Sequence, residues 1–344
     1  MRILVTGGAG FIGSHLVDSL IESEHDVIVF DNLSSGDARN VSRVRGEERF
    51  RFMKRDLKVM SDIQVNLDEI DLIFHLAANP EVRVGEVDPS VHFNENMVAT
   101  FNLLEGMRRS RSNGKIVFTS TSTIYGEAKV LPTPEDYGRA LPISTYGASK
   151  LGCEALISSY SYTFCIRGLI LRLANIVGAR SKHGIITDFI RKLKQNPREL
   201  EILGNGHQEK SYLHVEDCVS AIRRATDIFL IDNERVCVYN IGSFDTISVG
   251  RIAEIVVEEM GLTNVHFNFT GGVDGGRGWL GDVKNMTLDI TKLTSRGWKP
   301  RYNSEESVRL AVRETLLNER YPISEKSLDK KSPLRKPSSV ERTE

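Results

Sequence analysis

The feature that most constrains the fold is a glycine-rich segment directly behind an apolar run at the start of the chain. Residues 2–6 (RILVT) hold no turn-forming residue and predict a buried strand, and residues 14–20 have the apolar spacing of a helix. Between them lie Gly7, Gly10, Phe11, Ile12 and Gly13. Glycines at this spacing let the backbone approach a pyrophosphate at a helix N-terminus. The order of strand, glycine turn and helix therefore predicts a dinucleotide-binding loop.

An acid at the end of the next apolar run indicates which dinucleotide is bound. Residues 27–30 (VIVF) predict a second buried strand, and Asp31 follows it. An acid roughly 20 residues past the glycines would hold a ribose 2′-hydroxyl and repel a 2′-phosphate. Asp31 therefore favours NAD over NADP. The alternative is a tight turn capped by an aspartate without any ligand, which the complete order of elements disfavours.

Length and composition exclude several classes of protein. The chain has 344 residues and a net charge of −1, which gives no reason to expect nucleic-acid or membrane partners. Met1 leads directly into the first expected strand, so no signal or transit peptide is expected, and the apolar runs fall short of a membrane span. The four cysteines and the histidines lack metal-ligand spacing. We therefore expect a cytoplasmic protein with reduced thiols and no metal site.

The pattern along the chain predicts a Rossmann-like α/β fold with a doubly wound parallel sheet. Further strands are expected over residues 50–53, 72–76, 115–119 and 166–171, and helices over 89–109 and 146–160. This alternation weakens after Arg172. We therefore expect an NAD-binding domain over 1–172, a smaller α/β substrate-binding region over 173–320, and a disordered tail over 321–344.

The smaller region is expected to combine four helices with three short strands. The helices are expected over 185–194, 215–229, 249–260 and 304–317, and the strands over 201–203, 236–241 and 265–269. The tail contains almost no apolar residues and cannot bury enough surface to offset its ordering entropy.

A tyrosine and a lysine form the candidate reacting pair. Tyr146 and Lys150 lie four residues apart, on one face of the helix expected over 146–160. An ammonium beside a phenol favours the phenolate, so we expect Lys150 to lower the pKa of Tyr146. The hydroxyl-rich segment 119–123 (TSTST) would lie beside this pair, at the carboxyl edge of the sheet. The alternative is an ordinary surface helix whose Tyr and Lys reach toward solvent.

These motifs together resemble the extended short-chain dehydrogenase/reductase family. The resemblance covers about residues 1–320 and is strongest toward the UDP-glucose 4-epimerase branch of its NAD-dependent epimerase/dehydratase group. The stretches that carry it are residues 75–78 (HLAA), 78–83 (ANPEVR), 92–96 (HFNEN), 124–126 (IYG), 173–175 (LAN), 210–215 (KSYLHV) and 277–282 (RGWLGD).

The resemblance implies 4-epimerisation of UDP-glucose and UDP-galactose through a transient 4-keto sugar and a resident NAD. Tyr146 would take the proton of the sugar 4-hydroxyl, Thr121 would bridge that hydroxyl to Tyr146, and Lys150 would bind the nicotinamide ribose. Dehydratases and decarboxylases of the family carry acids where this chain has Ser122 and Thr123, so these reactions are the weaker hypothesis. Another UDP-, GDP- or CDP-sugar, or a non-catalytic NAD-binding regulator, are the alternatives left open.

The resemblance also assigns the remaining ligand contacts. Beside the glycine loop and the reacting pair, the NAD-binding residues would be Asp31, Asn32, Asp56, Leu57, Leu76, Ala77, Ala78 and Asn96. The residues binding the UDP-sugar would be Arg83, Thr121, Ser122, Thr123, Tyr146, Asn175, Lys210, Tyr212, Arg277 and Asp282. Family members usually pair through the helices at 91–109 and 146–160, so we expect a homodimer.

Two departures from the family pattern concern the nucleotide. Lys210-Ser211 stands where the family has Arg-Asp, which replaces a bidentate fork by a point charge. Arg277 lies two residues further from Gly281-Asp282 than in many relatives. The family's gatekeeper position falls on Met286, whose intermediate, adaptable side chain leaves the choice between plain and N-acetylated sugars open.

Overall fold

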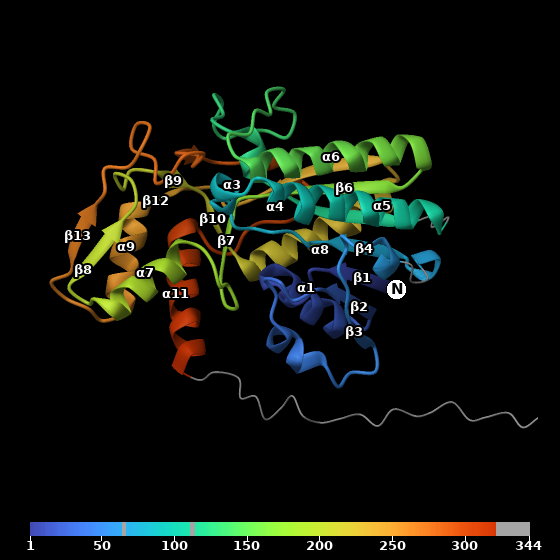
Figure 1. Ribbon diagram of the computed structural model, residues 1–344, viewed down its shortest axis with the longest axis horizontal. Helices are drawn as coiled ribbons and strands as arrows, with labels where there is room; N and C mark the ends of the chain where they lie inside the picture. Colours follow the sequence, from blue (N-terminus) through green and yellow to red (C-terminus); the bar gives the residue numbers. More distant parts are fainter. Residues whose placement is uncertain (64–66, 111–113, 321–344) are drawn as a thin grey trace, which may run out of the picture.

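The central sheet of the fold has seven strands, all parallel (Figure 1). The computed structural model describes residues 1–63, 67–110 and 114–320, so the tail expected over 321–344 lies outside the described residues. In spatial order the strands are β11 (Val236–Ile241), β6 (Arg167–Leu173), β5 (Lys115–Thr121), β4 (Leu72–His75), β1 (Arg2–Thr6), β2 (Asp26–Asp31) and β3 (Phe50–Lys54). The Rossmann-like fold class expected from the alternating pattern is thus confirmed.

Helices cover both faces of this sheet, because its strands carry apolar side chains in both directions. On one face lie α1 (Phe11–Glu22) and α8 (Val215–Asp232), and on the other lie α5 (Ala99–Arg109) and α6 (Thr145–Phe164). Ile3 and Val5 of β1 belong to the first core cluster, and Leu4 between them belongs to the second. Successive side chains of one strand point to opposite faces of the sheet, so β1 contributes to the core on both faces.

The order of the strands reverses between β1 and β4. The chain runs from β1 outward to β2 and β3, and then returns to β4 on the other side of β1. Thr6 and His75 are register partners at the carboxyl ends of these two strands, and Thr6 Oγ1 lies 2.7 Å from His75 Nδ1. A crevice opens at such a reversal, which is where open α/β sheets bind ligands.

The second lobe packs around its own core beside the carboxyl edge of the sheet (Figure 1). Its helices are α7 (Ile185–Gln195), α9 (Val249–Glu259) and α11 (Ser304–Arg320). Its short strands are β7 (Asn175–Val177), β8 (Glu199–Ile202), β9 (Glu209–Lys210), β10 (Tyr212–His214), β12 (Ile247–Ser248), β13 (His266–Phe269) and β14 (Asn285–Met286). β9 lies between β12 and β14, so residues far apart in the sequence meet at Lys210.

Short helical segments complete the chain. They are α2 (Met60–Ile63), α3 (Val84–Val87), α4 (Ser90–His92), α10 (Thr291–Thr294), the 3-10 helices η1 (Ala38–Val44), η2 (Leu67–Glu69) and η4 (Ser122–Tyr125), and the π-helical turn η3 (Phe93–Val98). The single helix expected over 89–109 is therefore a run of α4, η3 and α5.

The chain returns to the first lobe after residue 172. The strand expected over 236–241 is β11, which pairs with β6 as the edge of the main sheet. The helix before it, α8, packs against α1. The sheet thus draws on residues from both sides of the boundary expected at residue 172. None of the helices in the described ranges is long and apolar enough to cross a bilayer.

Candidate active site

A cavity of about 690 Å³ lies between the carboxyl edge of the sheet and the second lobe. Most of the residues that the sequence singled out line it together. They are Gly7, Gly10, Phe11, Ile12, Gly13, Asp31, Asn32, Asp56, Leu57, Leu76, Ala77, Ala78, Arg83, Thr121, Ser122, Thr123, Tyr146, Lys150, Asn175, Lys210, Tyr212, Asp282 and Met286. Asn96 and Arg277 are the two that lie outside the lining.

The glycine loop has a backbone that no larger residue could adopt. Gly7 has a φ of +72°, and a Cβ there would lie 2.7 Å from Ala77 N. A Cβ on Gly13 would lie 2.2 Å from the Gly7 carbonyl oxygen. Gly10 is the N-cap of α1 and offers no side-chain hydrogen bond to the helix terminus. The first turn therefore presents free N–H groups and a positive dipole end to the cavity, which suits a pyrophosphate.

Asp31 and Asp56 lie at the ends of neighbouring strands, on the side expected for adenosine. The Asp31 carboxylate accepts hydrogen bonds from Ala9 N at 3.0 Å and Leu33 N at 2.8 Å, and burial raises its pKa. Asn32 Nδ2 donates to Asp56 Oδ2 at 3.2 Å. Each Asp31 oxygen keeps a second lone pair, so the carboxylate can accept a ribose hydroxyl as well. This donor and acceptor set fits NAD.

The candidate reacting residues lie at the end of one element and at the beginning of another. Ser144 caps α6 by accepting a hydrogen bond from Gly147 N at 3.1 Å, which places Tyr146 in the first helical turn. Thr121 is the last residue of β5, and its Oγ1 lies 3.1 Å from Thr123 Oγ1. Thr121 lies close enough to Tyr146 to lower the pKa of its phenol as a hydrogen-bonding neighbour. The expected constellation of hydroxyls around Tyr146 is therefore present.

Lys150 is buried behind Tyr146 with no carboxylate bound to it among the described residues. Its Nζ donates to Thr119 O at 2.8 Å and lies 4.6 Å from the centre of the Phe118 ring. Burial lowers the pKa of Lys150 to about 8, against an opposing effect of Cys153 and Glu154. The ammonium is thus held at a fixed point of the cavity and titrates close to neutral pH.

The pKa of Tyr146 moves in the direction opposite to the one expected. Burial raises the pKa of Tyr146 to about 12, helped by Cys153, and the hydrogen bond with Thr121 lowers it by less. The sequence pattern predicted a lowering by Lys150. Helical spacing indicates that two side chains share a face, but it contains no information on how strongly the phenol is desolvated. The protein alone therefore keeps Tyr146 protonated.

Asn96 supports the site from behind. It lies in η3, is 1% exposed, and accepts from Asn79 N at 2.9 Å through Oδ1. Its Nδ2 donates to Ser149 Oγ at 2.9 Å. Asn96 thus joins the loop after β4 to the helix that carries Tyr146, which is a contact between two protein segments.

Arg277 lies outside the lining of the cavity. Its guanidinium is paired with Glu127, lies 2.9 Å from Asp274, and donates to Asp282 O at 2.6 Å. Asp282 is 4% exposed, and Lys210 Nζ lies 2.6 Å from its Oδ1. Lys210, at the position where the family pattern is broken, lines the cavity at this end, and Arg277 does not.

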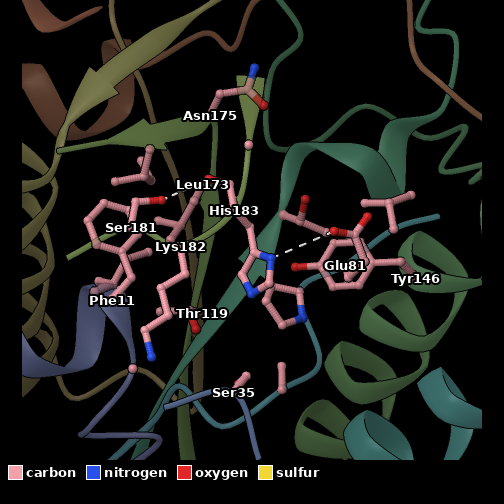
Figure 2. Close-up of a pocket in the computed structure, with 18 of the residues that line it drawn as sticks. Phe11, Ser35, Glu81, Thr119, Tyr146, Leu173, Asn175, Ser181, Lys182 and His183 are labelled. Atoms are coloured by element: carbon pink, nitrogen blue, oxygen red, sulfur yellow. Dashed lines mark hydrogen bonds and ion pairs between the residues drawn. The ribbon is translucent and has the colours of Figure 1, made fainter. Parts of the chain in front are cut away.

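Sequence reasoning missed a loop of the lining, residues 178–184 between β7 and α7. Arg180 pairs with Asp18 of α1 at 2.7 Å, and Lys182 pairs with Asp37 at 2.9 Å. His183 Nδ1 lies 3.8 Å from Glu81 Oε2 across the cavity (Figure 2). The signal that could have revealed the loop is its place at the carboxyl end of a strand, between Gly178 and Gly184, both with positive φ.

Known proteins match this chain over most of its length. The model of the NAD dependent epimerase/dehydratase family matches residues 3–242. A putative UDP-glucose 4-epimerase of Methanocaldococcus jannaschii is 34% identical over 316 residues, which are 90% of this chain and 97% of that protein. A crystal structure of UDP-galactose 4-epimerase is 44% identical, has a TM-score of 0.82, and the match covers 93% of this chain and 99% of that one.

A third similar protein is named for a different sugar substrate. The structure of UDP-glucuronic acid 4-epimerase from Bacillus cereus, in complex with UDP-glucuronic acid and NAD, is 28% identical with a TM-score of 0.81. That match covers 91% of this chain and 98% of the other. The cofactor is thus common to the family, whereas the sugar varies between members. On its sequence and its fold, this chain belongs to the NAD-dependent epimerase/dehydratase family.

Proposed function

We propose that this protein interconverts UDP-glucose and UDP-galactose by 4-epimerisation with a resident NAD. The observation that carries the proposal is the set of hydroxyls around Tyr146, supplied by Thr121, Ser122 and Thr123 without any carboxylate in that segment. The acids of dehydrating and decarboxylating family members would occupy the positions of Ser122 and Thr123. Without them the site supports oxidation and reduction at one carbinol and no elimination.

Tyr146 is the proposed acid and base for the sugar 4-hydroxyl. Its side chain accepts the proton in one direction and returns it in the other, and the Thr121 hydroxyl bridges the sugar 4-hydroxyl and Tyr146. NAD, when bound, supplies the oxidant for C4 of the sugar and a positive ring beside the tyrosine. A nearby positive charge favours the phenolate and opposes the burial that raises the pKa of Tyr146 to about 12.

Lys150 is the proposed ligand of the nicotinamide ribose. Thr119 O takes one of its three donors, which leaves two for ribose hydroxyls. Glu81 also lines the cavity (Figure 2), but its carboxylate accepts from Arg83 Nε at 3.3 Å and faces His183. We therefore assign Glu81 to closure of the cavity and not to acid catalysis.

Replacement of Tyr146 by Phe tests the proposal. The purified variant should keep its NAD but lose roughly 100-fold or more of its turnover of UDP-galactose, because general acid–base catalysis is removed. Tyr302→Phe is the matched control, since Tyr302 lies outside the lining of the cavity. UDP-glucose formation is followed by chromatography, beside UDP-N-acetylglucosamine, UDP-glucuronate, GDP- and CDP-sugars. Normal turnover by the Tyr146 variant, or faster turnover of another sugar, would contradict the assignment.

We further propose a homodimer that forms through the α4–α5 and α6 segments. Phe93 is 56% exposed, Phe101 is 44% exposed and Tyr162 is 64% exposed, and a partner chain on these segments would remove their rings from water. Light scattering after size-exclusion chromatography tests it: a mass of one chain at micromolar concentration would contradict the pairing.

A further inference from the structure

Two cations from opposite lobes lie over the ring of Trp279. The Arg83 guanidinium carbon is 5.8 Å from the centre of this ring, and Lys210 Nζ is 5.7 Å from it. Arg83 comes from the loop after β4 on the sheet side, and Lys210 comes from β9 in the second lobe. All three residues line the cavity. The indole therefore lies between the cavity residues of the sheet side and those of the second lobe.

Both cations keep donors free for a ligand. Arg83 uses Nε toward Glu81, and its two terminal nitrogens have no partner among the described residues. Lys210 gives one of its three donors to Asp282. Two like charges over one ring repel each other, and a bound anion would relieve that repulsion. A guanidinium and an ammonium on one side chain's ring, both lining the cavity, supply the two kinds of cation that bind phosphates in proteins.

The indole itself has an unused donor. Trp279 Nε1 is shielded from solvent and has no hydrogen-bond partner among the described residues. The turn that holds it is well fixed, because Asp282 N donates to Trp279 O at 3.2 Å and Asp282 Oδ2 accepts from Gly278 N at 3.1 Å. A buried N–H without an acceptor is unfavourable unless a ligand supplies one.

A second unpartnered group lies on the adjoining loop. Gln208 is 3% exposed, lines the cavity, and its Oε1 has no partner among the described residues. Its loop packs on the Trp279 loop, since Asn205 N donates to Gly276 O at 3.2 Å. A free donor and a free acceptor at one end of the cavity point to a ligand that offers both, as a nucleotide does.

We propose that Trp279 is a nucleotide-binding residue, whose indole and flanking Arg83 and Lys210 form the diphosphate subsite that Arg277 does not reach. The proposal rests on the proposed function in so far as the substrate is a nucleotide sugar. Arg277 is committed to Glu127, Asp274 and the Asp282 carbonyl, and stabilises the loop. In the proposed subsite the indole N–H of Trp279 therefore stands beside Lys210 in place of the loop arginine.

Calorimetric binding of UDP to the NAD-loaded protein tests the subsite. Trp279→Phe removes the N–H and keeps an aromatic ring, and should weaken UDP binding about tenfold, the loss typical of one hydrogen bond to a charged group. Arg277→Gln should weaken it less than Trp279→Phe does. Equal NAD content and thermal stability in both variants exclude general damage. UDP binding that is unchanged in Trp279→Phe and at least tenfold weaker in Arg277→Gln would overturn the proposal.

A measurement on the wild-type chain removes any dependence on variant folding. The protein has two tryptophans, and Trp298 is 5% exposed with Nε1 donating to Ser220 Oγ at 2.8 Å. In a ¹⁵N-indole NMR spectrum, saturating UDP should move the Trp279 N–H signal downfield and leave that of Trp298 in place. A Trp279 signal that does not move overturns the proposal. Wild-type protein that binds UDP but epimerises no nucleotide sugar would count against the proposed function alone.

Discussion

Replacing Arg172 by Met removes the centre of a buried polar cluster behind the reacting residues. Arg172 Nη2 lies 2.8 Å from Glu154 Oε2, and Nη1 donates to Tyr125 Oη at 2.8 Å and to Glu135 O at 2.7 Å. Glu154 belongs to α6 with Tyr146, and Tyr125 closes η4, which holds Ser122 and Thr123. The substitution therefore loosens both elements that carry the hydroxyls of the site.

The magnitude follows from burial. The Arg172 and Glu154 side chains are 11% and 6% exposed, so the variant leaves a carboxylate in the interior without its partner. Breaking such a pair costs about 3–5 kcal/mol. With an unfolding entropy of about 2.1 cal/mol/K per residue over about 320 residues, the melting temperature should fall by roughly 4–7 °C.

Differential scanning calorimetry on the NAD-loaded protein measures this shift. Arg43→Met is the matched control, because Arg43 and Glu22 lie 3.1 Å apart but are 70% and 61% exposed. Such a surface pair is worth about 0–1 kcal/mol, and its loss should lower the melting temperature by no more than about 1–2 °C. The double variant Glu154→Met/Arg172→Met removes both charges and should recover part of the loss. A shift for Arg172→Met no larger than that for Arg43→Met would refute the reasoning.

Two further substitutions probe the cofactor end of the cavity. Gly13→Ala places a Cβ 2.2 Å from the Gly7 carbonyl oxygen and should displace the loop, so the protein should purify with little NAD; full NAD content after acid extraction would argue against a rigid loop. Burial lowers the pKa of Lys150 to about 8, so its ammonium is present below that pH and is lost above it. Turnover should therefore fall as the pH rises through about 8. The Lys150→Arg variant stays charged, so its turnover should have a lower maximum but should not fall in this pH range. The same fall in turnover in both proteins would exclude Lys150 as its cause.

The sequence predicted the structure best at positions where the local backbone or the burial of both faces permits only one kind of residue. Strands β1 and β2 are continuous apolar runs because both faces of a parallel sheet are covered, so their bounds were predicted to within about a residue. The glycine loop was predicted because only glycine can adopt the backbone and approach distances at Gly7 and Gly13. The fold class and the backbone of the glycine loop could therefore be predicted from local patterns alone.

Features that depend on distant residues could not be predicted. The pairing of β11 with β6 joins segments 68 residues apart, as Val236 to Gly168, and nothing in either run indicates the partner. The pKa of Tyr146 depends on burial by the surrounding elements, which outweighs any effect of a neighbouring charge on its own helix.

Arg277 illustrates the limit of motif spacing for a binding site. The resemblance placed Arg277 among the residues binding the UDP-sugar, but Glu127, which lies 150 residues away in sequence, pairs with it. The same fold brings Arg83 next to Trp279 from a separate loop. The charge environment of a side chain is a tertiary property, and it decides which of several cations faces the ligand.

Retention of a label at the sugar C4 tests the central claim most directly. UDP-galactose carrying deuterium at C4 is incubated in ordinary water with the protein as purified, without added NAD, and the product is examined by NMR. A resident cofactor that returns what it removed predicts UDP-glucose with deuterium still at C4. UDP-glucose carrying solvent hydrogen at C4, or turnover only with continuous addition of NAD, would contradict the account.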